Sequence, residues 1–146
     1  MLSKSDFIQA FSHLGTKLIP STSGVPAVME EAYLKNNWFT TENVAFCLNN
    51  WSDCLDEDNL SQWLESIPAQ NESPKTIGII MAGNIPMVGF HDLLSVLCSG
   101  NRALVKLSDK DEVLMKYCIN TLISYNPELK DYIEITELVA KPDGLI

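Results

Sequence analysis

Two short apolar runs in the second half of the chain constrain its fold most. TIGIIM at residues 76–81 is a β-branched apolar run without polar alternation, and RALVK at residues 102–106 is a second candidate for a buried strand. Such runs are typical of strands that are covered on both faces in a parallel sheet. Between them, MVGFHDLLSVLCSG has helical spacing and ends at Gly100, where a left-handed residue can close the last turn. The sequence therefore predicts a strand–helix–strand unit.

The same alternation continues toward the C-terminus. Asp109, with Glu112 three residues later, has the spacing of a capping box before a helix in VLMKYCINTLISY. IEITELV at residues 133–139 is a third strand candidate, and DGLI at residues 143–146 has the pattern of a strand that has only begun. This order predicts a right-handed βαβαβ unit, half of a nucleotide-binding α/β sheet.

Residues 1–70 carry helical periodicity instead. Their apolar residues recur at intervals of three and four and predict helices that start near Ser3 or Ser5, near Ala27, at Thr40 or Thr41, and near Asp58. The polar segment SIPAQNESPK at 66–75 contains two prolines and connects the two halves. We therefore expect an α/β protein with a helical N-terminal region at residues 1–70. A partial, Rossmann-like cofactor-binding unit follows at residues 71–146.

Charge and composition narrow the classes of function. A formal net charge of −9 with only ten Lys and Arg residues counts against binding to nucleic acid or anionic membranes. We expect no membrane span, and the N-terminus lacks the pattern of a signal peptide, so we expect a cytoplasmic protein. The four cysteines form no C-x-x-C pair and the two histidines lie far apart in the sequence, which predicts reduced thiols and no metal site.

Residues 82–86, Ala-Gly-Asn-Ile-Pro, stand directly after the first predicted strand and are called the elbow below. In such sheets ligands bind beyond the carboxyl ends of the strands. Gly83 permits a close backbone approach, and Pro86 restricts Ile85 and starts the helix without wasting a donor. Asn84 then points its carboxamide into the crevice, or it closes a turn on its own backbone. The chain has no G-x-G-x-x-G here, so a nucleotide would bind in another style.

Polar residues also follow the second predicted strand. Lys106 ends that strand, where its ammonium can meet a ribose hydroxyl or a phosphate, or it extends off the sheet as a surface lysine. Asp109 can accept hydrogen bonds from a ribose or cap the next helix, and Ser108 is a further candidate for the cap. We expect His91, one turn into the predicted helix after the elbow, to be neutral and hydrogen-bonded within the fold.

The run TIGIIMAGNIPMVGFHDLLSVLCSGNRALVKLSDKDEVL resembles the start of the cofactor-binding domain of LuxC-type acyl-CoA reductases, in the aldehyde dehydrogenase superfamily. Members of the superfamily have a similar strand, an elbow with Asn followed one residue later by Pro, a helix, and a second strand ending in Lys. Upstream, NNWFTTENVAFCLNNWSD and NLSQWLESI resemble the helical N-terminal region of the same reductases. The resemblance covers about residues 36–139 and is most specific over residues 79–109.

This resemblance implies the N-terminal part of an NAD(P)H-dependent acyl-CoA reductase, with acyl-CoA as substrate and a sheet of the aldehyde dehydrogenase type. A cysteine thiolate would attack the thioester, and hydride from the cofactor would reduce the enzyme thioester to an aldehyde. Asn84 would donate to the thioester or hemithioacetal oxygen. The residues expected at the cofactor, NADPH or NADH in the full-length parent, are Ala82, Gly83, Ile85, Pro86, Lys106, Ser108 and Asp109.

The chain also departs from these reductases. Their nucleophilic cysteine lies in a later domain and none of the four cysteines here matches it; Cys98 is expected to be buried and inert, with a raised pKa. The chain ends at Ile146, before a Gly-Ser turn of the relatives, so we expect a fragment that is inactive alone. The alternative is a noncatalytic module that binds a nucleotide or a protein partner. An apolar sheet edge left by truncation predicts a homo-oligomer.

Overall fold

A computed structural model describes residues 1–68 and 73–146. Its first part is helical, with α1 (Lys4–Lys17), α2 (Val25–Lys35), α3 (Thr41–Cys54) and α4 (Glu57–Glu65). Strands and helices then alternate, as β1 (Thr76–Ile80), α5 (Phe90–Cys98), β2 (Arg102–Lys106), α6 (Glu112–Tyr125), the 3₁₀ helix η1 (Pro127–Asp131), β3 (Ile133–Ile135) and β4 (Gly144–Leu145). The mixed α/β class and the βαβαβ order are confirmed. The expected boundary between residues 70 and 71 lies outside the described residues.

The strands form one parallel sheet in the order β3-β2-β1-β4. The two central strands pair in register from Thr76 opposite Arg102 to Ile80 opposite Lys106. Because parallel neighbours end at the same edge of a sheet, the segments that follow β1 and β2 start side by side. The elbow and the loop that carries Ser108 therefore share one edge.

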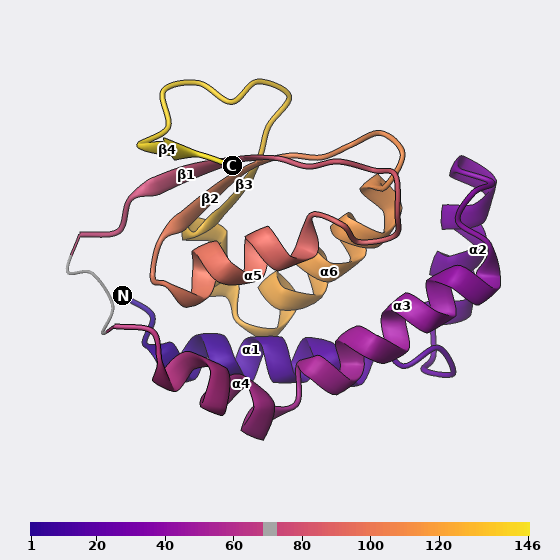
Figure 1. Cartoon of the computed structure of the whole chain (residues 1–146), viewed down its shortest axis with the longest axis horizontal. Coiled ribbons are helices and arrows are strands. Elements are labelled where there is room, and N and C mark those ends of the chain that lie inside the picture. Colours follow the sequence, from indigo (N-terminus) through magenta and orange to yellow (C-terminus); the bar gives the residue numbers. More distant parts are fainter. Residues whose placement is uncertain (69–72) are drawn as a thin grey trace.

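The helices cover the sheet in two layers. Figure 1 shows α5 and α6 against one face of the sheet, with α1, α3 and α4 beyond them. Of the described residues, the segment between β3 and β4 lies over the opposite face. Phe90, the first residue of α5, contacts Phe11 of α1 and Trp51 of α3 edge to face, with ring centroids 6.0 Å and 4.6 Å apart. Buried apolar residues from both parts of the chain join in one core. α1 and α3 therefore hold the start of α5, the helix that follows the elbow.

α1, α3 and α4 begin where a polar side chain satisfies free N–H groups, whereas α2 begins after Gly24 without a side-chain cap. Ser3 and Asp6 form a reciprocal capping box at α1, and the Thr40 side chain accepts a hydrogen bond from the Asn43 N–H at 3.2 Å. These two caps are among the predicted candidates. The prediction of a cap at Asp58 is wrong, because Asp56 accepts from the Asp58 N–H at 3.0 Å and α4 begins at the next residue, Glu57.

Two further boundaries differ from the sequence prediction. Asp109 does not cap α6, which begins at Glu112, and the Glu112 carboxylate instead pairs with Lys35 and Lys116. The predicted strand over residues 133–139 ends at Ile135. The Thr136 hydroxyl donates to the Leu138 carbonyl at 2.9 Å and accepts from the Leu138 N–H at 3.2 Å, which turns the chain away from the sheet.

Two other predictions about element ends are confirmed. Gly100 has φ +79° and its N–H donates to the Leu97 carbonyl at 2.9 Å, so it closes α5 as a left-handed residue. Gly144 and Leu145 pair with Ile77 and Gly78 of β1, as expected of a strand at residues 143–146. Within the described ranges, none of the helices combines the length and apolar character that a bilayer crossing requires.

Candidate functional site

The elbow after β1 does not lead directly into a helix. Residues 84–89 form bends and turns, and α5 begins only at Phe90. Met87 has φ +57°, a left-handed conformation that residues other than glycine rarely adopt. This turn redirects the chain before the helix, so the prediction that Pro86 starts the helix is wrong.

The Asp111 carboxyl group holds Met87 in this conformation. Asp111 Oδ2 accepts a hydrogen bond from the Met87 backbone N–H at 2.7 Å. The residue is only 3% exposed, and Oδ1 has no hydrogen-bond partner among the described residues. Burial raises the pKa of Asp111 to about 7, against the lowering effect of the bond from Met87. The Asp111 carboxyl group thus binds the backbone of Met87, the residue directly after the elbow, and makes no side-chain cap for α6.

Cys47 of α3 holds the other side of the elbow. Its Sγ donates to the Pro86 carbonyl at 3.3 Å. Burial raises the pKa of the Cys47 thiol to about 11, and the nearby Asp111 carboxylate adds to that effect. A thiol with so high a pKa is not a nucleophile at neutral pH, and its role here is to anchor the backbone.

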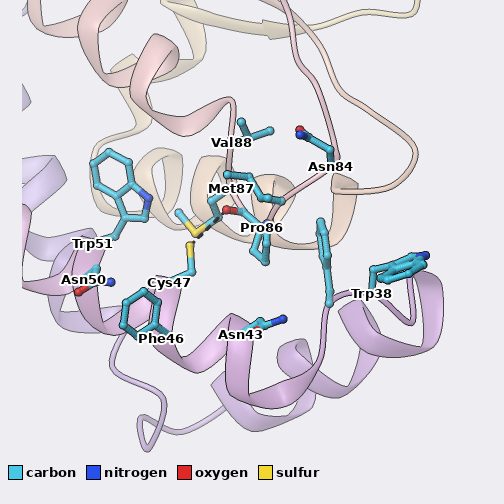
Figure 2. A pocket seen from close by; sticks show the side chains of 12 residues that line it. Trp38, Asn43, Phe46, Cys47, Asn50, Trp51, Asn84, Pro86, Met87 and Val88 are labelled. Atoms are coloured by element: carbon cyan, nitrogen blue, oxygen red, sulfur yellow. Dashed lines mark hydrogen bonds between the residues drawn. The ribbon is translucent and has the colours of Figure 1, made fainter.

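A groove of about 710 Å³ runs between α3 and the elbow. Figure 2 shows Cys47 pointing from α3 toward Pro86 and Met87, while Asn84 lies on the opposite side of the elbow from Trp51. The walls of the groove are mostly aromatic and apolar, with three exposed carboxamides and no ionised side chain among the lining residues. The lining residues are Trp38, Phe39, Asn43, Phe46, Cys47, Asn50, Trp51, Asn84, Ile85, Pro86, Met87 and Val88.

A second pocket, of about 580 Å³, adjoins the elbow and shares Trp38 and Asn84 with the groove. Its other lining residues are Lys35, Asn36, Gly83, Asp109 and Lys110. The structure therefore brings three predicted site residues, Gly83, Asn84 and Asp109, to one pocket. Two of the remaining ones, Ile85 and Pro86, line the groove, whereas Ala82, Lys106 and Ser108 line neither cavity.

Asn84 presents a free carboxamide. Its side chain is exposed and makes no hydrogen bond to any residue in 1–68 or 73–146, so the alternative of a turn closed on its own backbone is not formed. Lys106 is exposed at the end of β2, and its carbonyl accepts from the Met81 N–H at 3.0 Å. That bond carries the sheet pairing to the first residue after β1, immediately before the elbow.

Gly83 allows the close approach that the sequence predicts, and the group that approaches is Ser108. A Cβ atom at Gly83 would overlap Ser108 Oγ and would lie 2.8 Å from Ser108 Cβ and 2.9 Å from Lys110 Cβ. Ser108 itself accepts from the Lys110 N–H at 3.3 Å and so forms a turn in this loop. The two loops at the carboxyl edge are therefore in contact.

The other chemically reactive side chains are not assembled at this edge. Burial raises the pKa of Cys98 to about 12, which confirms an inert thiol, and that of Cys118 well above its ordinary value. Cys54 is exposed, and all four cysteines are free. His91 is exposed beside Trp63, with ring centroids 6.3 Å apart, and lacks the expected hydrogen bond to the described residues. In the described part of the chain, no three His, Cys, Asp or Glu side chains are grouped to hold a metal ion.

Comparisons with protein-family models, with curated proteins and with solved structures found no match for this chain. The function is therefore argued from the elbow itself. Its distinguishing features are a free carboxamide, an uncharged groove on one side, and a pocket with Lys35 and Lys110 on the other.

Proposed function

We propose that this chain is the N-terminal and cofactor-facing part of an NAD(P)H-dependent acyl-CoA reductase with a sheet of the aldehyde dehydrogenase type. Asn84 carries the proposal. Its carboxamide is exposed and without a partner among the described residues, on an elbow at the carboxyl end of a central parallel strand. That edge is where ligands of open α/β sheets bind. A fixed amide donor at such an edge suits an oxygen on which negative charge develops.

The proposed reaction needs two groups that residues 1–146 do not supply. A cysteine thiolate attacks the acyl-CoA carbonyl carbon, the carbon–sulfur bond to CoA breaks, and CoA leaves as a thiolate that takes up a proton. The nicotinamide cofactor, when bound, supplies the hydride that reduces the enzyme thioester to an aldehyde and frees the cysteine. Asn84 Nδ2 donates to the carbonyl-derived oxygen in both half-reactions. Burial makes Cys47, Cys98 and Cys118 unsuitable as the thiolate, and the exposed Cys54 lines neither cavity at the elbow. The proposal therefore assigns the nucleophile to another segment.

The second pocket suits the anionic part of a dinucleotide. Lys35 and Lys110 line it together with Asp109, and Lys35 also pairs with Glu112. Lys106 is exposed at the end of the neighbouring strand. In the proposal Lys106 and Asp109 approach the adenosine ribose, where Asp109 favours NADH and Lys106 can neutralise the 2′-phosphate of NADPH. Free cysteines suit a reducing compartment, which supports the proposed cytoplasmic location.

A titration of the chain with NADPH and with NADH tests this assignment. Trp38 lies in both cavities and is 85% exposed, so its fluorescence reports on a ligand there. We expect saturable quenching at millimolar nucleotide. Lys106→Met should weaken binding about tenfold through loss of a charged contact, while Lys130→Met, on η1 at the start of β3, should not. Absence of any response at millimolar concentrations of both nucleotides would remove the cofactor assignment.

A noncatalytic module that acts by self-association is the second candidate, and one observation favours it. The sheet face opposite α5 and α6 lacks a covering helix in Figure 1. Around that face and its β4 edge, Ile80, Leu138, Leu145 and Ile146 are 55%, 75%, 62% and 54% exposed. Exposed apolar side chains beside an open sheet edge are typical of interaction sites, and a second copy of this chain would extend the sheet at β4.

A further inference from the structure

One buried charge-bearing group has no role in the reaction proposed above. Asp111 lies just before α6, yet its side chain reaches the elbow after β1 and accepts the Met87 N–H at 2.7 Å. The bond joins the two loops that follow the central strands. A carboxyl group that is 97% buried is costly unless it is hydrogen-bonded, so this contact requires a structural explanation.

The strained residue is the one that Asp111 holds. A non-glycine residue in the left-handed region is strained and persists only where its surroundings determine it. Met87 is such a residue, with φ +57°, and its side chain is 1% exposed. Its carbonyl accepts from the Phe90 N–H at 3.0 Å, which starts α5, and Cys47 fixes the preceding carbonyl of Pro86. Asp111 supplies the only bond to the Met87 N–H within the described residues.

We infer that Asp111 is the positioning residue of the elbow, whose carboxyl group fixes the left-handed turn at Met87 and thereby the place at which Asn84 presents its carboxamide. Asn84 lies three residues before Met87, on the same run of bends and turns. The catalytic meaning of this inference rests on the proposed reductase function. The clamp between Asp111 and Met87 does not, and it can be tested on the chain alone.

The hydrogen bond between Asp111 and Met87 is sensitive to pH because no cation in residues 1–68 or 73–146 compensates the Asp111 charge. The ionisable groups packed near it are the thiols of Cys47 on α3 and Cys118 on α6, both kept protonated by burial. Its neighbours along the chain are Lys110, which is exposed, and Glu112, which pairs with Lys35 and Lys116. With a pKa of about 7, Asp111 ionises around neutral pH. An ionised carboxylate accepts a stronger hydrogen bond than a carboxylic acid does, so the Met87 N–H reports its state.

Heteronuclear NMR of the chain between pH 5 and pH 9 tests the inference. We expect the Met87 amide proton to move downfield as pH rises through about 7, with the same midpoint as the Asp111 carboxyl carbon. The Asn84 side-chain amide resonances should follow. Asp111→Asn should abolish this titration while it keeps an acceptor for Met87. Asp109→Asn, which removes an exposed carboxylate from the same loop, should leave the titration intact.

Amide hydrogen exchange shows whether the Met87 N–H is held by the side-chain acceptor at position 111. Asp111→Ala removes the acceptor, and we expect the Met87 amide to exchange about 2- to 13-fold faster than in Asp111→Asn, the range for a hydrogen bond between neutral groups. The same titration of Met87 in Asp111→Asn would overturn the inference. If Asp111→Asn does not fold, the unmodified chain decides, because an Asp111 carboxyl that titrates without the Met87 and Asn84 signals overturns it. Failure of the nucleotide titration alone would remove the reductase proposal and leave the clamp.

Discussion

Three acidic residues lie between positions 109 and 112, after β2, and each makes different contacts in the structure. Asp109 is exposed at the second pocket, Glu112 pairs with Lys35 and Lys116, and Asp111 is buried against the elbow. The sequence favours Asp109 as the cap because of its spacing to Glu112. It carries no local signal for Asp111, whose partner lies 24 residues away. Contacts of this kind arise from tertiary packing and have no signature in local spacing.

Asp111 predicts a specific dependence of stability on pH. Folding raises its pKa from 3.8 to about 7, so the native state binds this proton more tightly than the unfolded state. Its contribution to the free energy of unfolding is therefore complete below about pH 4 and falls as pH rises toward 7. Relative to Asp111→Asn, the unmodified chain should lose up to about 4 kcal/mol between pH 4 and pH 8. Urea unfolding of both proteins at the two pH values measures this difference, and a constant difference would contradict the buried ionisation.

At the scale of elements, the contact between the elbow and the loop after β2 depends on Gly83. Gly83→Ala inserts a methyl group where Ser108 and Lys110 already lie, which should cost on the order of 1–3 kcal/mol of unfolding free energy. Gly144→Ala is the matched control, because its Cβ atom would meet only Ile77 Cδ1 at 3.2 Å. Thermal or urea unfolding compares them.

A second substitution makes that prediction sharper. Ser108→Gly removes the two Ser108 atoms that a methyl group at Gly83 would overlap but leaves Lys110 Cβ, so it should recover part of the loss in the double variant. Additive effects of the two substitutions would show that the loops are not in direct contact.

The sequence predicts elements better than it predicts their ends. The buried strands β1 and β2, the capped helices α1 and α3, and the left-handed end of α5 follow from local patterns that tertiary contacts reinforce. The late start of α5 follows from Met87, and the early end of β3 follows from Thr136. The groove was missed as well, since its walls come from α3 and the elbow, 39 residues apart at Cys47 and Pro86.

For the whole molecule, the layer arrangement predicts self-association through the open side of the sheet. Leu138, in the segment between β3 and β4, is 75% exposed, and Leu34 on α2 is 73% exposed and serves as a matched control. We expect a dimer by analytical ultracentrifugation. Leu138→Glu should weaken the dimer about 10- to 100-fold, because it removes a leucine that the dimer interface would bury. Leu34→Glu should leave the dimer unchanged. A strictly monomeric chain at high concentration would contradict this expectation.

In the proposed function, the elbow fixes the Asn84 amide beside an oxygen that becomes negatively charged during acyl-CoA reduction. The most direct measurement is the turnover of an intact reductase that carries these residues, with Asn84→Ala compared with Asn49→Ala, an exposed asparagine on α3 outside both cavities. Loss of one oxyanion donor costs ~2.7–4 kcal/mol, so Asn84→Ala should lower turnover by about two to three orders of magnitude. Near-normal acyl-CoA reduction by Asn84→Ala would contradict the account.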